Sequence, residues 1–169
     1  WLELQSRLTL PPGRYEVRLA AEASERAGGV ITQVDIPDFS RPRLSISGLV
    51  LGRPRDGTSD VLADLIPVRP TAARLLPPAI PVTAFLRVYQ GGKGTFRSIQ
   101  VHARIADAAG RLVFGETSEL GTALFGSARA ADYRLELPLA RLNNGEHLLT
   151  IEATDGKATV QRDVRFTVG

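Results

Sequence analysis

Two histidines are the residues of this chain best suited to acid–base or metal chemistry. His102 lies in an alternating segment and points to its polar face, together with Gln100 and Arg104. His147 lies in a different alternating segment, in phase with apolar neighbours. A zinc site needs about four converging ligands, and the chain has no cysteine to supply one. We therefore predict no metal site, no cofactor and no catalytic residue at either histidine.

The loop Asp56-Gly-Thr58-Ser59-Asp60 is the other candidate, because carboxylate and hydroxyl oxygens bind hard cations such as calcium. Its spacing differs from the Asp-x-Ser-x-Ser pattern of a von Willebrand A-type metal site, and no apolar strand precedes it. We interpret it as a solvated loop, with calcium binding as the alternative. The chain also has no Gly-x-Ser-x-Gly elbow and no phosphate-binding loop. These patterns predict a protein that is not an enzyme.

A repeated corner is the most informative pattern. Leu10-Pro-Pro-Gly13-Arg-Tyr15 matches Leu142-Asn-Asn-Gly145-Glu-His147, and each copy is followed by an alternating segment. In a tyrosine corner, the Tyr15 hydroxyl hydrogen-bonds to backbone a few residues upstream at the end of a sandwich. His147 occupies the equivalent position. We therefore predict that Gly13, Tyr15, Gly145 and His147 are structural corner residues.

Composition limits the class of protein. The chain has 169 residues, of which 43% are hydrophobic and 23% charged, so it can bury a core. The absence of cysteine excludes disulfides and thiol chemistry, and no apolar run reaches the roughly 18 residues of a membrane span. The basic residues are mostly arginines spread along the chain, which indicates solvated strand faces rather than nucleic-acid binding. Because the chain starts at Trp1 and has no methionine, we expect a processed chain or a fragment.

Alternation of apolar and polar residues predicts strands through most of the chain. Seven candidate strands follow residue 43, near 44–51, 80–90, 97–106, 111–115, 131–139, 146–154 and 157–168. The prolines of 62–81 exclude a long helix there and indicate an edge strand or crossover, and one helical turn is expected within 122–131. We predict an all-β chain with a complete immunoglobulin- or fibronectin-III-like antiparallel sandwich over residues 44–169.

Residues 1–39 resemble the last three strands of a second, truncated sandwich, with strands over 2–10, 15–21 and 30–36. Residues 40–43 form the junction. Three strands cannot bury both faces of a sandwich, so the apolar side chains of this unit need a cover. We expect other protein chains as partners, either copies of this chain or the rest of a parent polypeptide, because the proline-containing junction is stiff.

Several segments resemble the C-terminal region of bacterial VWFA-related domain proteins. These are 10–21 (Leu-Pro-Pro-Gly-Arg-Tyr-Glu-Val-Arg-Leu-Ala-Ala), 34–40 (Val-Asp-Ile-Pro-Asp-Phe-Ser), 44–51 (Leu-Ser-Ile-Ser-Gly-Leu-Val-Leu), 70–74, 85–89 and 133–153. The von Willebrand A-type domain of that family is absent here. The resemblance implies an exported protein, extracellular, at the cell surface or in the periplasm. It assigns no activity to this region and no functional residue.

Three classes of function remain open. The first is a non-catalytic β-sandwich module for adhesion, spacing or protein–protein interaction. The second is a self-assembling subunit of an extracellular fibre or complex that uses β-strand complementation. The third is a carbohydrate-binding accessory module, for which Phe96 and Phe125 are the aromatic residues expected to be exposed.

Overall fold

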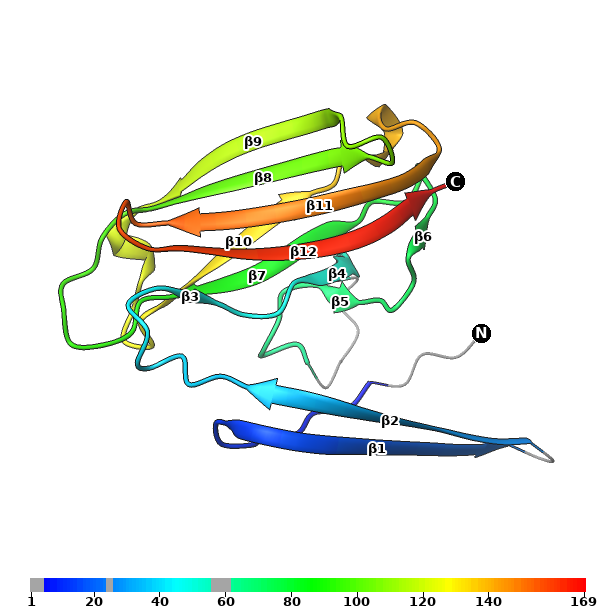
Figure 1. Cartoon of the computed structure of the whole chain (residues 1–169), viewed down its shortest axis with the longest axis horizontal. Helices are drawn as coiled ribbons and strands as arrows, with labels where there is room; N and C mark the ends of the chain where they lie inside the picture. The colour runs from blue at the N-terminus through cyan, green and yellow to red at the C-terminus, as the bar shows by residue number, and fades with distance from the viewer. Residues whose placement is uncertain (1–4, 24–25, 56–61) are drawn as a thin grey trace. The chain divides into compact units, whose positions relative to one another are not determined.

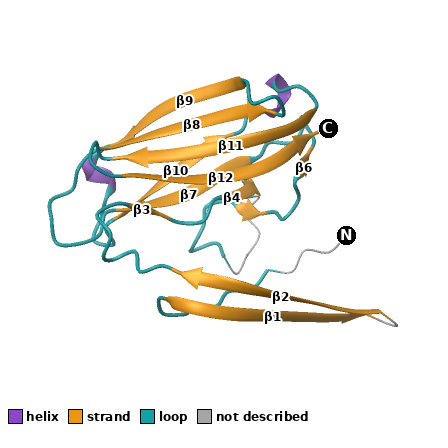
Figure 2. Cartoon of the chain, in the orientation of Figure 1, coloured by secondary structure: helices purple, strands orange, loops and turns teal. Residues whose placement is uncertain are grey.

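We describe the chain from a computed structural model, which covers residues 5–23, 26–55 and 62–169. It comprises two compact units: Leu8–Asp38, and the remainder of the chain. Figure 2 shows that strands dominate, with two short 3-10 turns at Thr122–Leu124 and Leu139–Arg141. Within the described ranges, no helix is long and apolar enough to span a membrane.

The larger unit contains two five-stranded sheets (Figure 1). The first sheet has the order β10-β7-β4-β5, with β3 also paired to β7. Its strands are β3 (Ser45–Ile46), β4 (Val50–Arg53), β5 (Arg69–Pro70), β7 (Thr83–Tyr89) and β10 (Ala130–Glu136). The second sheet has the order β6-β12-β11-β8-β9. Its strands are β6 (Leu75–Leu76), β8 (Ile99–Asp107), β9 (Leu112–Leu120), β11 (Gly145–Thr154) and β12 (Thr159–Val168).

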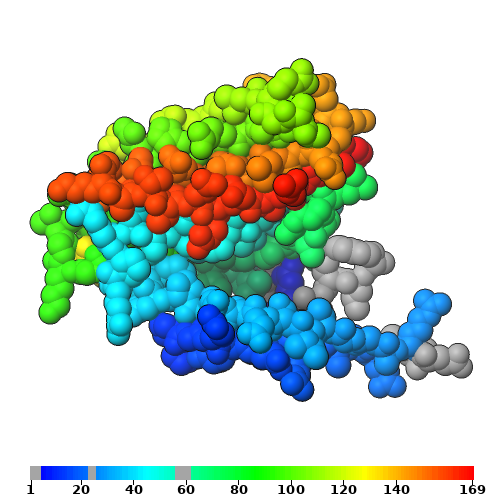
Figure 3. Space-filling model, viewed as in Figure 1, coloured from blue at the N-terminus to red at the C-terminus, as the bar shows by residue number. Residues whose placement is uncertain are grey.

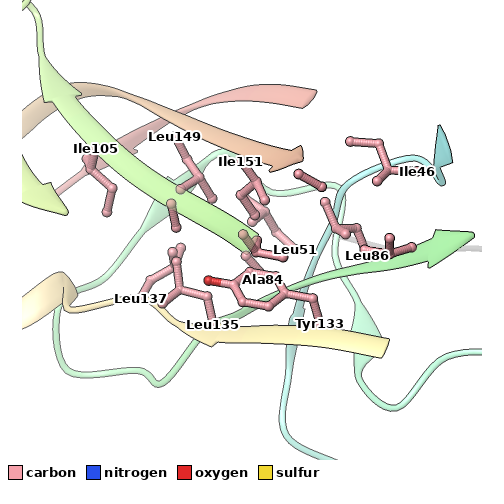
Figure 4. Packing of buried hydrophobic residues seen from close by; sticks show 14 of the residues in the cluster. Ile46, Leu51, Ala84, Leu86, Ile105, Tyr133, Leu135, Leu137, Leu149 and Ile151 are labelled. Atoms are coloured by element: carbon pink, nitrogen blue, oxygen red, sulfur yellow. The ribbon is translucent and has the colours of Figure 1, made fainter. Parts of the chain in front are cut away.

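The core lies between these two sheets. Alternate side chains of β8 and β11 point inward, so Ile105, Leu149 and Ile151 are fully buried. They pack against Leu86 and Tyr133 of the opposite sheet within one hydrophobic cluster, as Figure 4 shows. Alternation along a strand places every second side chain in this layer, which is how the sequence pattern determines the core. The predicted all-β, immunoglobulin-like sandwich is confirmed.

Three predicted segments differ in detail from the structure. The strand predicted at 44–51 is divided into β3 (Ser45–Ile46) and β4 (Val50–Arg53). The strand predicted at 111–115 continues to Leu120 and lies at a sheet edge, where Glu116, Thr117 and Glu119 are exposed and Leu120 is buried. The proline-rich segment 62–81 contributes only the two-residue strands β5 and β6, each at the end of a sheet. Proline lacks the N–H that an interior strand needs, so short edge strands are the expected result.

The smaller unit is an antiparallel hairpin of β1 (Gly13–Ala23) and β2 (Arg26–Ile36). The first strand expected before it is not seen, since described residues 5–12 are not in a strand. Residues 5–7 instead belong to the larger unit, where Gln5 donates to the Pro70 carbonyl oxygen at 3.1 Å. The adjacent Pro11 and Pro12 have no N–H groups, which prevents a continuous ladder into β1.

Candidate functional site

Tyr15 forms the backbone hydrogen bond that a tyrosine corner requires. Its hydroxyl donates to the Pro11 carbonyl oxygen at 2.9 Å, four residues upstream. The ring lies beside Gly13, where an added Cβ would stand 3.4 Å from the ring atoms. That distance is an ordinary van der Waals contact, and the two prolines before Gly13 restrict the backbone that accepts the bond. The contact organises the start of β1.

His147 occupies the matching position in the hairpin of β11 and β12. Gly13 pairs with Ile36 and Tyr15 with Val34, just as Gly145 pairs with Val168 and His147 with Phe166. The His147 Nδ1 lies 3.0 Å from the Gly145 carbonyl oxygen, so this nitrogen carries the proton that is donated. Gly145 has φ of +127°, a conformation that side chains rarely adopt. The histidine is 4% exposed and stacks on Phe166, with ring centroids 5.5 Å apart.

A cavity of about 440 Å³ adjoins His147 at this end of the sandwich. Asp107 and Glu146 also line it, but Asp107 is already engaged. Its carboxylate accepts hydrogen bonds from the backbone and side chain of Arg111 and from the amide of Ala109, which lower its pKa. Among the described residues, no group of three or more His, Asp or Glu side chains is placed to hold a metal.

The other predicted candidates lie apart. His102 is on β8, half-buried, with Nδ1 3.0 Å from the Thr117 hydroxyl oxygen. It pairs with Glu152 on β11, whereas His147 pairs with Asp107 at the far end of β8, so the histidines do not converge. The loop 56–60 lies outside the described residues.

The expectation of exposed aromatic rings is wrong. Phe125 is 3% exposed and Phe96 is partly buried, and the two rings lie 5.8 Å apart against the core. The glycines beside these residues suggested loops, but the ring of each residue turns inward because burial of a phenylalanine is worth roughly 1.5–3 kcal/mol. They do not form a surface for stacking sugars.

The most distinctive surface is one face of the β1–β2 hairpin. Alternation and register place the side chains of Val17, Leu19, Val30, Val34 and Ile36 on it, beside the Tyr15 ring. Leu19 is 59% exposed and Val30 is 53% exposed. We call these six residues the apolar hairpin face. Exposed, contiguous apolar side chains on a soluble protein mark interaction sites.

The opposite face of the hairpin is mostly charged. Arg14 pairs with Asp35 across the strands at 2.9 Å, and Arg18 pairs with Glu16 at 2.6 Å. Ile31 is the exception, an apolar side chain that is 65% exposed on this charged face. The hairpin is therefore amphipathic, and its neighbouring residues Val30 and Ile31 lie on opposite faces.

Sequence reasoning proposed the corners but missed two cavities of the larger unit. The cavity at His147 forms where the ends of β8, β11 and β12 lie side by side. Residue spacing in the sequence does not show which strand ends are neighbours. A second cavity is lined by Arg129, which has a positive φ, and by residues of the loop 90–97. Only the Gly91-Gly92-Lys93-Gly94 segment in the same loop signalled unusual backbone there.

Comparison with known proteins finds distant structural similarities. No protein-family model and no curated protein matches the chain. Solved structures that it resembles include the C-terminal domain of wzt, at 13% identity and TM-score 0.46, over 79% of this chain and 82% of that one. An immunoglobulin-like protein from Pseudomonas aeruginosa is 13% identical with TM-score 0.42, over 77% and 99%. Dimeric latent PorU from Porphyromonas gingivalis is 16% identical with TM-score 0.43, over 94% and 12%.

Proposed function

We propose that this chain is a non-catalytic β-sandwich module that acts in protein–protein interaction, in adhesion or as a spacer between partners. The observation that carries the proposal is the apolar hairpin face. A two-stranded hairpin alone is marginally stable in water, and it gains stability when another surface covers it. Complete burial of a side chain such as Leu19 stabilises a protein by roughly 1.5–3 kcal/mol. Because Leu19 is about half exposed, a partner that covers it would add about half of that free energy.

The partner that we propose for this face is a second copy of the chain. The unit Leu8–Asp38 contains three basic and five acidic residues, whereas the remainder contains eighteen basic and thirteen acidic residues. The hairpin is thus net acidic and the sandwich net basic. Opposite net charges favour association of one copy's hairpin with another copy's sandwich, and they raise the rate of encounter.

An alternative is self-assembly by strand addition into a fibre or complex. It is favoured by open strand edges: within the described residues, β1 pairs only with β2, and β9 pairs only with β8. Such edges present free N–H and C=O groups that another strand can complete. This alternative depends on backbone edges, whereas the first depends on the side chains of the apolar hairpin face.

An exported location, extracellular, at the cell surface or in the periplasm, belongs to the same proposal. It is supported by the resemblance of segments such as 10–21 and 44–51 to the C-terminal region of VWFA-related domain proteins. Fractionation of the source cells tests it. Recovery of the chain outside the cytoplasm supports the proposal, and recovery in the cytoplasm alone contradicts it.

Light scattering coupled to size exclusion, from low to high micromolar protein, tests the interaction. We expect the mass of the unmodified chain to rise from monomer towards dimer. Val30→Ser should suppress this rise, because it places a hydroxyl on the apolar hairpin face. The matched control is Ile31→Ser, which changes the adjacent and more exposed residue on the charged face and should associate normally.

Each outcome is decisive. A monomer at every concentration contradicts self-association. Equal association of Val30→Ser and Ile31→Ser, whether lost or retained in both, contradicts the role of the apolar hairpin face. Retained association in both variants favours the strand-edge alternative. That alternative is tested by a proline substitution at Gln33 of β2, because proline removes an N–H while leaving the apolar side chains in place.

A further inference from the structure

A second cavity, distinct from the hairpin, is lined by three arginines. It has a volume of about 270 Å³ and lies between the segment at Arg43, the loop 90–97, Arg129 and Asp155. Arg97 and Thr95 of the loop complete its wall. Ligand pockets for drug-sized molecules span roughly 300–1,000 Å³, so this one suits a small group. We call it the arginine pocket.

The one carboxylate of the arginine pocket is already occupied. Asp155, whose side chain is 3% exposed, accepts hydrogen bonds from the Nε of Arg43 and from the amides of Lys157 and Ala158. Burial raises the pKa of Asp155, but these donors outweigh it and lower the pKa to about 2. Asp155 therefore stays ionised. Its negative charge offsets the positive charge of one arginine, so the arginine pocket has a net charge of +2.

Donor groups remain free in the arginine pocket. Arg129 uses Nε to reach the Gln90 carbonyl oxygen at 2.6 Å and Nη2 to reach the Gly94 carbonyl oxygen at 2.8 Å, and its Nη1 has no protein partner in the described part of the chain. The exposed guanidinium of Arg97 has no hydrogen bond or ion pair to any described residue. These N–H groups line one small space.

The loop that carries Arg97 is held in place before any ligand arrives. The side chain of buried Gln90 both donates to and accepts from the backbone of Arg97, at 2.8 and 2.9 Å. Arg129 has φ of +53° and lies over the Phe96 ring at 4.4 Å. It is the one non-glycine residue with positive φ in the described ranges, and strained backbone of this kind clusters at functional sites.

We propose that the arginine pocket binds an oxyanion, the phosphate or sulfate group of a small ligand. Guanidinium groups form short, charge-assisted and frequently bidentate hydrogen bonds to such groups. A dianion would neutralise the excess charge of the pocket and engage the free donors of Arg97 and Arg129. Arg129 is fixed by its backbone contacts and its ring contact, so little ordering accompanies binding.

The test is a titration of the whole chain at constant ionic strength, followed by NMR of the backbone amides and arginine Nε–H groups. The probes are inorganic phosphate, inorganic sulfate and a hexose phosphate, with chloride as the reference anion. We expect saturable shifts at Gly91, Gly94 and Arg97. Tighter binding of the hexose phosphate than of inorganic phosphate identifies a phosphorylated sugar as the ligand class, and equal binding identifies the free oxyanion.

Arg97→Gln should weaken binding about tenfold, since it removes a charge-assisted donor from an exposed side chain without a protein partner. Arg134→Gln is the matched control, because it removes the same charge from an exposed position on β10 outside the pocket. Binding by this control should match that of the unmodified chain. Shifts that do not saturate, shifts that chloride reproduces, or equal losses in both variants would overturn the proposal.

Discussion

The β1–β2 and β11–β12 hairpins are built alike and lie in different surroundings. Both begin with a glycine, carry a ring two residues later that hydrogen-bonds to nearby backbone, and share one register. β11 also pairs with β8, and its inward side chains are fully buried. Figure 3 shows β11 and β12, in orange and red, on the surface of the larger unit.

The comparison separates local from tertiary information. The corner hydrogen bonds form in both hairpins because glycine, ring and acceptor lie within a few residues of each other. Burial of the strand faces does not follow from the same pattern, since it depends on a second sheet. Alternation thus identifies an apolar face, and the rest of the molecule or a partner determines what covers it.

The largest expected difference is at equivalent apolar positions of the two hairpins. Ile151→Ala should cost about 2–5 kcal/mol of unfolding free energy, because it leaves a cavity in a fully buried site. Leu19→Ala, at the matching position of β1, should cost less than about 1 kcal/mol in dilute solution because the side chain is 59% exposed. Urea denaturation of both variants measures this, and equal costs would show that the two faces are equally covered.

The second largest difference is expected in how much the ion pairs of the two hairpins contribute to the unfolding free energy. Asp155→Asn should cost about 1–3 kcal/mol at neutral pH, since its carboxylate is buried and accepts several hydrogen bonds. Asp35→Asn is the matched control: both members of its pair with Arg14 are about three-quarters exposed, and such pairs contribute roughly 0–1 kcal/mol.

The contribution of Asp155 to the unfolding free energy should also depend on pH. The pKa of Asp155 is lowered from 3.8 to about 2 in the folded chain, so its stabilising contribution is present above about pH 4 and is lost as the pH falls towards 2. The difference in unfolding free energy between the unmodified chain and Asp155→Asn should therefore shrink over this range. A difference that stays constant from pH 5 to pH 2 would contradict the assigned role of the carboxylate.

The smallest expected effect is at the corner of β1. Tyr15→Phe removes one hydroxyl-to-carbonyl hydrogen bond, worth about 1 kcal/mol, so amide exchange in residues 13–36 should accelerate about fivefold. Residues 145–168 serve as the internal control and should exchange at their original rates. Unchanged exchange in residues 13–36 would mean that the hydroxyl does not stabilise the hairpin.

Much of this fold could be predicted from the sequence because strand alternation and turn glycines are local signals. The strands predicted at 80–90, 97–106, 131–139, 146–154 and 157–168 belong to this class, whereas the strand predicted at 44–51 is two short strands, β3 and β4. The hydrogen bonds at Tyr15 and His147 also join residues close in sequence. The expected strand before Pro11 could not be excluded from the sequence, because alternation does not say whether a neighbouring strand is present to pair. Phe125 was misplaced for a related reason: its burial depends on contacts with residues distant in sequence.

The arginine pocket was not predictable for a different reason. Its arginines come from segments far apart in the chain, and the free donors of Arg97 and Arg129 follow from which carbonyl oxygens the loop presents. A spread of arginines along a sequence is typical of solvated strand faces. Only the folded chain brings these three together.

The central claim, that a second copy covers the apolar hairpin face, is tested most directly by hydrogen exchange as a function of protein concentration. We predict that protection of the amides of residues 13–36 rises from low to high micromolar concentration in the unmodified chain and in Ile31→Ser, but stays low in Val30→Ser. Protection that is independent of concentration in all three proteins would contradict the claim.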